Sequence, residues 1–349
     1  MPVGCKTTNV CSTAGMVSQF PLDYMHMVLL GVMKLLLVRW VFGPRGLGRA
    51  AIAEISARLL LYQQYCPSEF ARRPRSLDDV KKWKATEYRQ FLCYIGVVAV
   101  RNKMPEAYYK NFLYLVCAMR ILLNADLCRL NHQRTHRLMS RFIEGACDAY
   151  GDDVAVYNVH GLIHLPADAA KYGSLDNVSS FPYENHMYQI KKLLRKPGCT
   201  LKQIVNRTLE RRNMDEVKQK QTTKYMRLHE DGPVPDGFEE SEQYDKVIVD
   251  GTAYSRGRRD SCLKFDDKFG MVVNVLRKDN VAYVVLKRFK SVGPLFSEPR
   301  VSTSYGMHLA QDLSMSLFVR KATTCNKCYP LPLERNKFAV VELSSKNFN

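Results

Sequence analysis

The stretch that decides the fold is FPLDYMHMVLLGVMKLLLVRW, residues 20–40. Pro21 stands where a helix can begin, and apolar residues then recur every three or four positions, which is the spacing of a helix with one buried face. These positions are Leu22, Met25, Leu29, Leu30, Met33, Leu36, Leu37 and Trp40. Because His26, Lys34 and Arg39 interrupt the apolar run, we expect a buried core helix here and no membrane span.

Helical patterns continue beyond this stretch. Gly43, Pro44 and Gly46 end the first helix. The same spacing predicts helices over residues 52–65, 84–100, 105–124, 130–150 and 157–170. Another helix is expected to start directly after Ser180-Phe181-Pro182, because proline is favoured in a first helical turn. Residues 189–228 also look helical, so we assign residues 1–19 to a flexible N-terminus and residues 20–228 to one helical region.

The composition changes at HEDGPVPDGFEESEQYD, residues 229–245, which is acidic and rich in proline and glycine. Such a stretch suits a linker, which we place at residues 229–243. Short runs rich in Val, Tyr and Phe follow, separated by turns such as Asp250-Gly251. They predict strands over residues 246–249, 271–276, 281–289, 316–320 and 338–343. The expected fold class is therefore α+β, with a helical N-terminal region and a small, barrel-like antiparallel β domain at residues 244–349.

The charge of the chain points to a polyanionic partner. The formal net charge is +18 and the pI is about 9.4, a balance that favours nucleic acid or an anionic surface. Residues 189–228 hold twelve Lys or Arg against three acids, which gives this segment +9. From charge alone, a solvated helix face and a phosphate-binding face are equally good interpretations. The eleven cysteines are scattered and no secretory signal precedes them, so we expect free thiols in a reducing compartment.

Two pairs of residues have the spacing of metal ligands on a helix. Asp23 and His26 are three residues apart, and His160 and His164 are four apart, so each pair can share a helix face. One carboxylate and three imidazoles would suit a tetrahedral zinc ion. For any single histidine, however, a hydrogen-bonded helix residue is the ordinary interpretation.

Other residues of the same kinds have simpler interpretations. His132 and His136 share the four-residue spacing but lie among polar residues, and we expect them on a solvated face. Cys325 and Cys328 form a single CxxC without a second pair, which favours a turn with two free thiols. Glu184 falls in the first turn of a predicted helix, where a carboxylate is ordinary.

A family resemblance adds to this reading. The strings FPLDYMHMVLLGVMKLLLVRW (20–40), PSEFARRPRSLDDVKKWKATEYRQFLCYIGVVAV (67–100), YNVHGLIHL (157–165) and GSLDNVSSFPYENHMYQIKKLLR (173–195) resemble transposases of the CACTA (En/Spm) kind found in animals. The resemblance runs from about Phe20 to Arg212, and the β domain resembles one that often follows. It implies a cut-and-paste transposase with an RNase H-like core, in which Asp, Asp and Glu hold two divalent metal ions.

The resemblance also implies roles for particular residues. Asp23 and His26 match an Asp-x-x-His pair in a helical insertion, and Glu184 within SSFPYE matches the third catalytic acid. By analogy with the V(D)J recombinase and hAT transposases, a structural zinc site would be formed by Asp23, His26, His160 and His164. The cations that follow Glu184 would then contact the DNA backbone. They are Lys191, Lys192, Arg195, Lys196, Lys202, Arg207, Arg211 and Arg212.

One departure from the family pattern limits the expected activity. The relatives carry both catalytic aspartates and a CxxC element before the Asp-x-x-His pair, whereas the 22 residues before Asp23 contain no Asp, no Glu and no CxxC. One glutamate cannot hold two metal ions. We therefore expect an N-terminally truncated remnant that binds DNA without cleaving it by itself, with Mg²⁺ or Mn²⁺ needed only if a complete triad exists.

The expected partner is DNA, contacted mainly at its phosphates, and nuclear residence follows from the resemblance alone. A homo-oligomer is compatible with the sequence, which does not specify one. The alternative function is a protein-interaction module, adopted by the host, that acts through the β domain.

Overall fold

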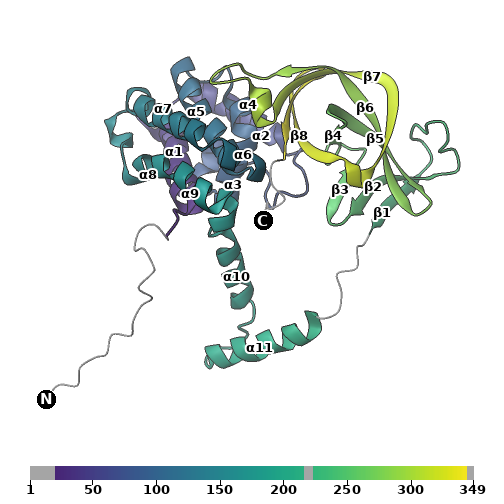
Figure 1. The fold of residues 1–349 in the computed structure, drawn as a ribbon, viewed down its shortest axis with the longest axis horizontal. Helices are drawn as coiled ribbons and strands as arrows, with labels where there is room; N and C mark the ends of the chain where they lie inside the picture. Colours follow the sequence, from purple (N-terminus) through teal and green to yellow (C-terminus); the bar gives the residue numbers. More distant parts are fainter. Residues whose placement is uncertain (1–19, 216–222, 344–349) are drawn as a thin grey trace.

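The computed structural model describes residues 20–215 and 223–343. A helical body lies beside a curved antiparallel sheet, and two helices extend from the body as an arm (Figure 1). The fold class is α+β, as expected from the sequence, while the flexible segment predicted at residues 1–19 lies outside the described residues. The helices and helical turns of the body and arm are η1 (Met25–Met33), α1 (Lys34–Phe42), α2 (Arg49–Tyr62), η2 (Leu77–Lys82), α3 (Ala85–Gln90), η3 (Phe91–Ile95), α4 (Gly96–Val100), α5 (Glu106–Leu122), α6 (Ala125–Leu130), α7 (His132–Tyr150), η4 (Asp152–Val154), α8 (Tyr157–Gly161), η5 (Leu162–His164), α9 (Leu165–Tyr172), η6 (Leu175–Val178), α10 (Phe181–Lys191) and α11 (Thr200–Asp215).

The sheet consists of antiparallel pairs. Its strands are β1 (Lys224–His229), β2 (Glu242–Val249), β3 (Thr252–Ser255), β4 (Cys262–Phe265), β5 (Lys268–Lys278), β6 (Val281–Pro294), β7 (Met307–Lys321), β8 (Asn326–Glu334) and β9 (Lys337–Glu342). The order is β1-β2-β5-β4-β8-β9-β7-β6, and β3 pairs with β2. Because β6 also pairs with β5, each of the six strands from β5 to β6 along this path pairs with two others of the six, and β5 pairs with β2 as well.

The first helix lies at the centre of the helical body, as its apolar spacing predicted. Met25, Leu29, Met33 and Leu36 are fully buried, and the Trp40 ring packs edge-on against Phe112 at 5.2 Å between centroids. Its first half, η1, is wound more widely than an α-helix. The stretch Met25–Phe42 is long and apolar enough to cross a membrane. Half of it is buried in the core, so it is the core helix of the body.

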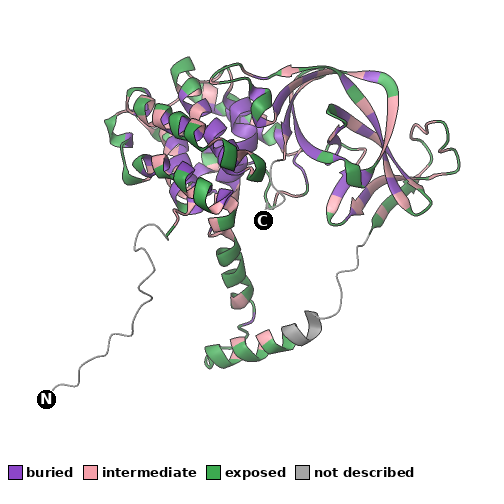
Figure 2. Ribbon diagram, in the orientation of Figure 1, coloured by how far each residue is buried: buried purple, intermediate pink, exposed green. Residues whose placement is uncertain are grey.

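The sheet and the helical body share one hydrophobic core. Tyr329 of β8 is fully buried in the same cluster as the first helix, and its hydroxyl donates to the Tyr62 carbonyl oxygen at 3.0 Å. The buried Arg120 of α5 donates to the carbonyl oxygens of Tyr305 at 2.5 Å and Glu342 at 3.0 Å. Figure 2 shows buried segments continuing from the helices into the adjoining strands. The β domain is thus packed onto the body rather than joined by a linker alone.

The helical assignment of residues 224–228 is wrong. Residues 224–228 were expected to be helical, but Lys224–His229 forms strand β1, which pairs with β2. The acidic stretch 229–243 therefore connects two paired strands inside the sheet instead of separating two domains. The helix expected over residues 189–228 is also interrupted, because α10 ends at Lys191 and α11 begins at Thr200.

The strands that the sequence missed are short or contain proline. Strand β8 includes Pro330 and Pro332, which cannot donate to a ladder and argue against a central strand. Its partner β4 pairs only with Asn326 and Lys327, so the prolines face no strand on that side. Cys328 is buried in strand β8, whereas the sequence predicted a turn for the CxxC motif. The nine cysteines that the structure describes are free, as expected.

Candidate nucleic-acid interface

Asp23 caps the first helix and ties it to the start of the arm. Its Oδ1 accepts from the Ser180 backbone N–H at 2.9 Å, and its Oδ2 accepts from the His26 backbone N–H at 3.2 Å and lies 2.5 Å from the His26 Nδ1. Partial burial pushes the pKa of Asp23 upward, but the hydrogen bonds from Ser180 and His26 outweigh it and hold that pKa below its usual value. Both carboxylate oxygens are therefore used within the protein.

Loss of this cap should be measurable and should depend on pH. The Asp23→Ala variant is expected to unfold with about 1 kcal/mol less free energy than the wild type at neutral pH. Because the folded-state pKa of Asp23 is lowered, the contribution is complete above the unfolded value of about 4 and is lost as the pH falls through the folded value. Urea unfolding from neutral to acidic pH measures it, with alanine at the exposed Asp236 as the matched control. A pH-independent difference would contradict this assignment.

His26 and Glu184 meet at the base of the arm. Glu184 lies in the first turn of α10, and its Oε1 is 3.4 Å from the His26 Nε2, with both side chains more than half exposed. The structure therefore brings together three residues that the sequence analysis singled out, Asp23, His26 and Glu184. Asp168 and Asp176, the two acidic residues that precede Glu184 most closely along the chain, have structural partners. Asp168 accepts from the Leu22 N–H, and Asp176 pairs with the buried Arg89 at 2.8 Å.

The two remaining predicted zinc ligands, His160 and His164, lie in α8 and in η5. His160 and His164 are exposed, and their ring centroids are 5.8 Å apart. Their helix packs closely on η1, since a Cβ on Gly161 would lie 2.7 Å from the Met27 Sδ. Within residues 20–215 and 223–343, no three His, Cys, Asp or Glu residues are grouped to hold a metal ion. The four predicted ligands thus lie on packed elements without forming one donor set.

The arm carries the predicted DNA-binding cations. We define the arm as residues 181–210, that is α10, the connecting loop and α11 up to Glu210. No residue of α10 is buried, and Figure 2 shows the arm as mostly exposed. Lys191, Lys192, Arg195, Lys196 and Lys202 are exposed and Arg207 is half-buried, whereas the side chains of Arg211 and Arg212 lie outside the described residues.

The loop of the arm has a defined shape. Gln203 accepts from the Arg195 N–H at 3.1 Å and donates to the carbonyl oxygens of Lys196 at 2.9 Å and Gly198 at 2.7 Å. Gly198 adopts a φ of 85°, which favours glycine, so the chain can reverse direction here. The cations on the loop are therefore presented on an ordered elbow between two helices.

None of the six described cations of the arm takes part in an ion pair with another described residue. The described part of the arm contains six Lys or Arg against Glu184 and Glu210, a balance of +4. The Lys192 ammonium lies 4.3 Å from the centre of the Tyr188 ring. Lys192 remains exposed to solvent despite this contact. The arm is therefore an uncompensated cationic surface.

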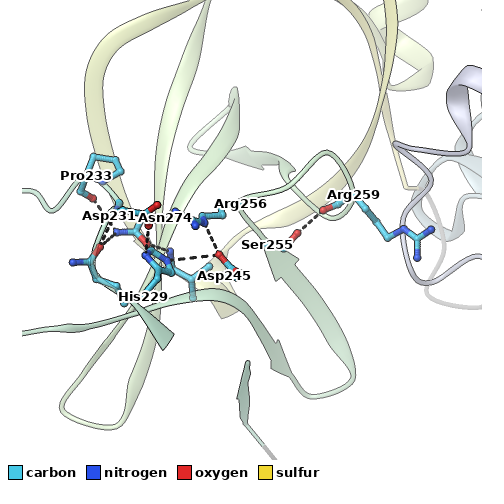
Figure 3. Close-up of polar contacts among 11 residues, drawn as sticks. His229, Asp231, Pro233, Asp245, Ser255, Arg256, Arg259 and Asn274 are labelled. Atoms are coloured by element: carbon cyan, nitrogen blue, oxygen red, sulfur yellow. Dashed lines mark hydrogen bonds and ion pairs between the residues drawn. The ribbon is translucent and has the colours of Figure 1, made fainter. Parts of the chain in front are cut away.

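The β domain contains a polar cluster that no sequence pattern predicted (Figure 3). The Asp231 Oδ1 is 2.8 Å from the His229 Nδ1 and 2.7 Å from the Arg256 guanidinium, which also donates to Asp245 at 2.5 Å. The hydrogen bond from Arg256 lowers the pKa of Asp231. Nearby, the buried Asn274 donates to the Pro233 carbonyl oxygen at 3.2 Å. These contacts hold the acidic β1–β2 connection on the sheet, so its charges are partly neutralised there.

Comparisons with known proteins identify the β domain only. The model of a domain of unknown function, DUF8592, matches residues 228–343, which is about a third of the chain and covers β2 to β9. No curated protein and no solved structure matches the chain. The β domain is thus similar to a recurrent domain whose function is open.

Proposed function

We propose that this chain is a DNA-binding protein of transposase descent that contacts the phosphate backbone through the arm. The observation that carries the proposal is the set of exposed, unpaired cations on α10, the elbow and α11. Phosphates of duplex DNA recur every few ångströms, and cations without internal partners can neutralise them at no cost in lost ion pairs. The net charge of +18 supports the same partner.

The experiment is a salt titration of binding to random-sequence duplex DNA. If all six described cations neutralise phosphates, the logarithm of the association constant should fall against the logarithm of the salt concentration with a slope of about −5. Fluorescence polarisation of a labelled duplex measures this slope. Absent binding, or affinity that does not change with salt, would contradict the proposal and favour the protein-interaction alternative.

Transposase descent would account for the position of Glu184 in the first turn of α10. The resemblance gives this residue the position of the third catalytic acid, so α10 would be the terminal helix of an RNase H-like core. Glu184 contacts His26, and the nearby Asp23 already uses both oxygens in hydrogen bonds, which supports binding without cleavage. Supercoiled plasmid incubated with Mg²⁺ or Mn²⁺ should be nicked no faster by the wild type than by Glu184→Gln. Faster nicking by the wild type would show a working metal site.

We also propose that the six mutually paired strands of the β domain form a closed barrel. The support is the β5–β6 pairing, which joins the two ends of the path through β4, β8, β9 and β7.

Nuclear residence belongs to the DNA-binding proposal and rests on the transposase resemblance alone. A fluorescent fusion of the chain would show it.

The structural zinc site expected from the resemblance stays a proposal. The donor chemistry of Asp23, His26, His160 and His164 suits zinc, although Asp23 is occupied by hydrogen bonds and the four are not grouped. Purified protein should contain about one zinc per chain by mass spectrometry of the metal. The double variant His160→Ala, His164→Ala should lack it, whereas zinc-free wild type would rule the site out.

A further inference from the structure

Helix α11 carries an apolar stripe that the described chain leaves in solvent. Leu201, Val205 and Leu209 are four residues apart, and they are 78%, 53% and 52% exposed. Ile204 and Thr208 lie on the same face and are half-buried. A 16-residue helix without tertiary contacts is only marginally stable in water, because helices in proteins depend mostly on a packed apolar face. This face therefore calls for a partner surface.

The flanks of the stripe define the charge of that surface. At about 100° per residue, Lys202 borders the apolar face next to Leu209. Arg207 lies about 60° beyond Ile204 on the other side. Neither forms an ion pair with another described residue. A complementary surface would be an apolar hollow with carboxylates at its edge.

The helical body presents such a hollow between α7 and α8. A cavity of about 410 Å³ is lined mainly by apolar side chains, including Ile143, Ala146, Cys147, Val154, Val156 and Val159. The exposed Asp148 and Asp152 lie next to this lining along the chain, and neither takes part in an ion pair with a described residue. Tyr157, which also lines the cavity, is 77% exposed and extends the apolar surface. In a chain of charge +18, an apolar hollow with two unpaired carboxylates close to its lining along the chain complements the stripe and its cations.

We propose that α11 of one copy docks onto the α7–α8 cavity of a second copy, and that the contact is reciprocal. In Figure 1, α11 lies at the far end of α10, away from α7 and α8 of its own chain. Exchange of arms uses the same two surfaces in each copy, so it closes a two-fold dimer. A 16-residue helix is about 24 Å long and about 10 Å wide, so α11 presents a face on the order of 240 Å². Two reciprocal contacts, each of which buries this area on both copies, would bury on the order of 1,000 Å² in total, which is the lower bound for a specific interface.

The test measures the oligomeric state of the full chain in the absence of DNA, so it is independent of the proposed function. Sedimentation equilibrium over a concentration series should show a dimer. The variant Leu201→Asp, Val205→Asp should be a monomer, and the control Asn206→Gln, a neutral change at an exposed position outside the stripe, should stay dimeric. Far-UV circular dichroism checks that each variant keeps its helices.

Charge exchange locates the contact. Lys202→Glu with Arg207→Glu should weaken the dimer by roughly tenfold or more, and so should Asp148→Lys with Asp152→Lys. All four substitutions together should restore it, because the paired charges are merely exchanged between the surfaces. A monomeric wild type, including one whose arm folds onto its own body, overturns the proposal. A dimer that survives the Asp substitutions in the stripe, or that the fourfold exchange fails to restore, overturns it as well.

Discussion

Alanine at Lys191, Lys192, Arg195 and Lys196 is expected to weaken binding to random-sequence duplex DNA by on the order of 100-fold at low salt. The four side chains are exposed, and none pairs with a described carboxylate. Their loss removes up to four phosphate contacts, so the slope of log affinity against log salt should become shallower by about 3 to 4. Fluorescence polarisation over a salt series measures both effects.

A matched variant separates the arm from general charge. Alanine at four exposed cations of the β domain removes the same +4 elsewhere and should leave most of the slope unchanged. These cations are Lys268, Lys290, Lys321 and Arg335. An equal loss of affinity and slope in both variants would mean that overall charge, and not the arm, determines binding.

Lys327→Met is expected to lower the free energy of unfolding by about 3 kcal/mol. The Lys327 ammonium is 4% exposed and lies 2.6 Å from carboxylate oxygens of both Glu69 and Asp260. Removal of a buried partner leaves an uncompensated charge, which costs about 3 to 5 kcal/mol. The lower figure applies because Lys246 remains 3.5 Å from Asp260. Urea unfolding with constant m-value measures the change.

The double variant tests the cause of this loss. Adding Asp260→Asn to Lys327→Met should recover much of the stability, because the buried charge then disappears together with its partner. The control Lys337→Met removes a lysine whose ion pair with the exposed Glu334 is long, at 3.8 Å, and should change little. A loss below about 1 kcal/mol for Lys327→Met would show that this cluster does not hold the sheet to the helical body.

The elements with a strong period were predictable from the sequence. The first helix, α5 and α7 carry apolar residues every three or four positions, and the structure confirms them with bounds close to those expected. The strands β5 and β6 follow from their Val- and Tyr-rich runs in the same way. Strand β1 was read as helix because its residues, KYMRLH, contain no alternation and follow a basic helical segment. Its conformation comes from pairing with β2, a contact that no local pattern encodes.

The candidate site was predictable in part. The residue spacing predicted that Asp23 and His26 share one helix face, and the family resemblance indicated Glu184. Neither predicted that the Asp23 carboxylate accepts a hydrogen bond from the backbone N–H of Ser180, 157 residues away. The cluster around His229 and Arg256 was missed because its members are spread over several strands and have no common spacing. Only the register of those strands brings them together.

The sequence alone determined the period of the helices and the basic character of the arm, because these properties depend on residues close together along the chain. The tertiary structure decided that the β sheet shares the core of the helical body, that the acidic stretch is held within the sheet, and that the arm stands free with its cations and apolar stripe exposed. The physical reason is that burial and pairing are settled between residues far apart in sequence. Whether a charge is neutralised or an apolar face covered depends on which distant element packs against it.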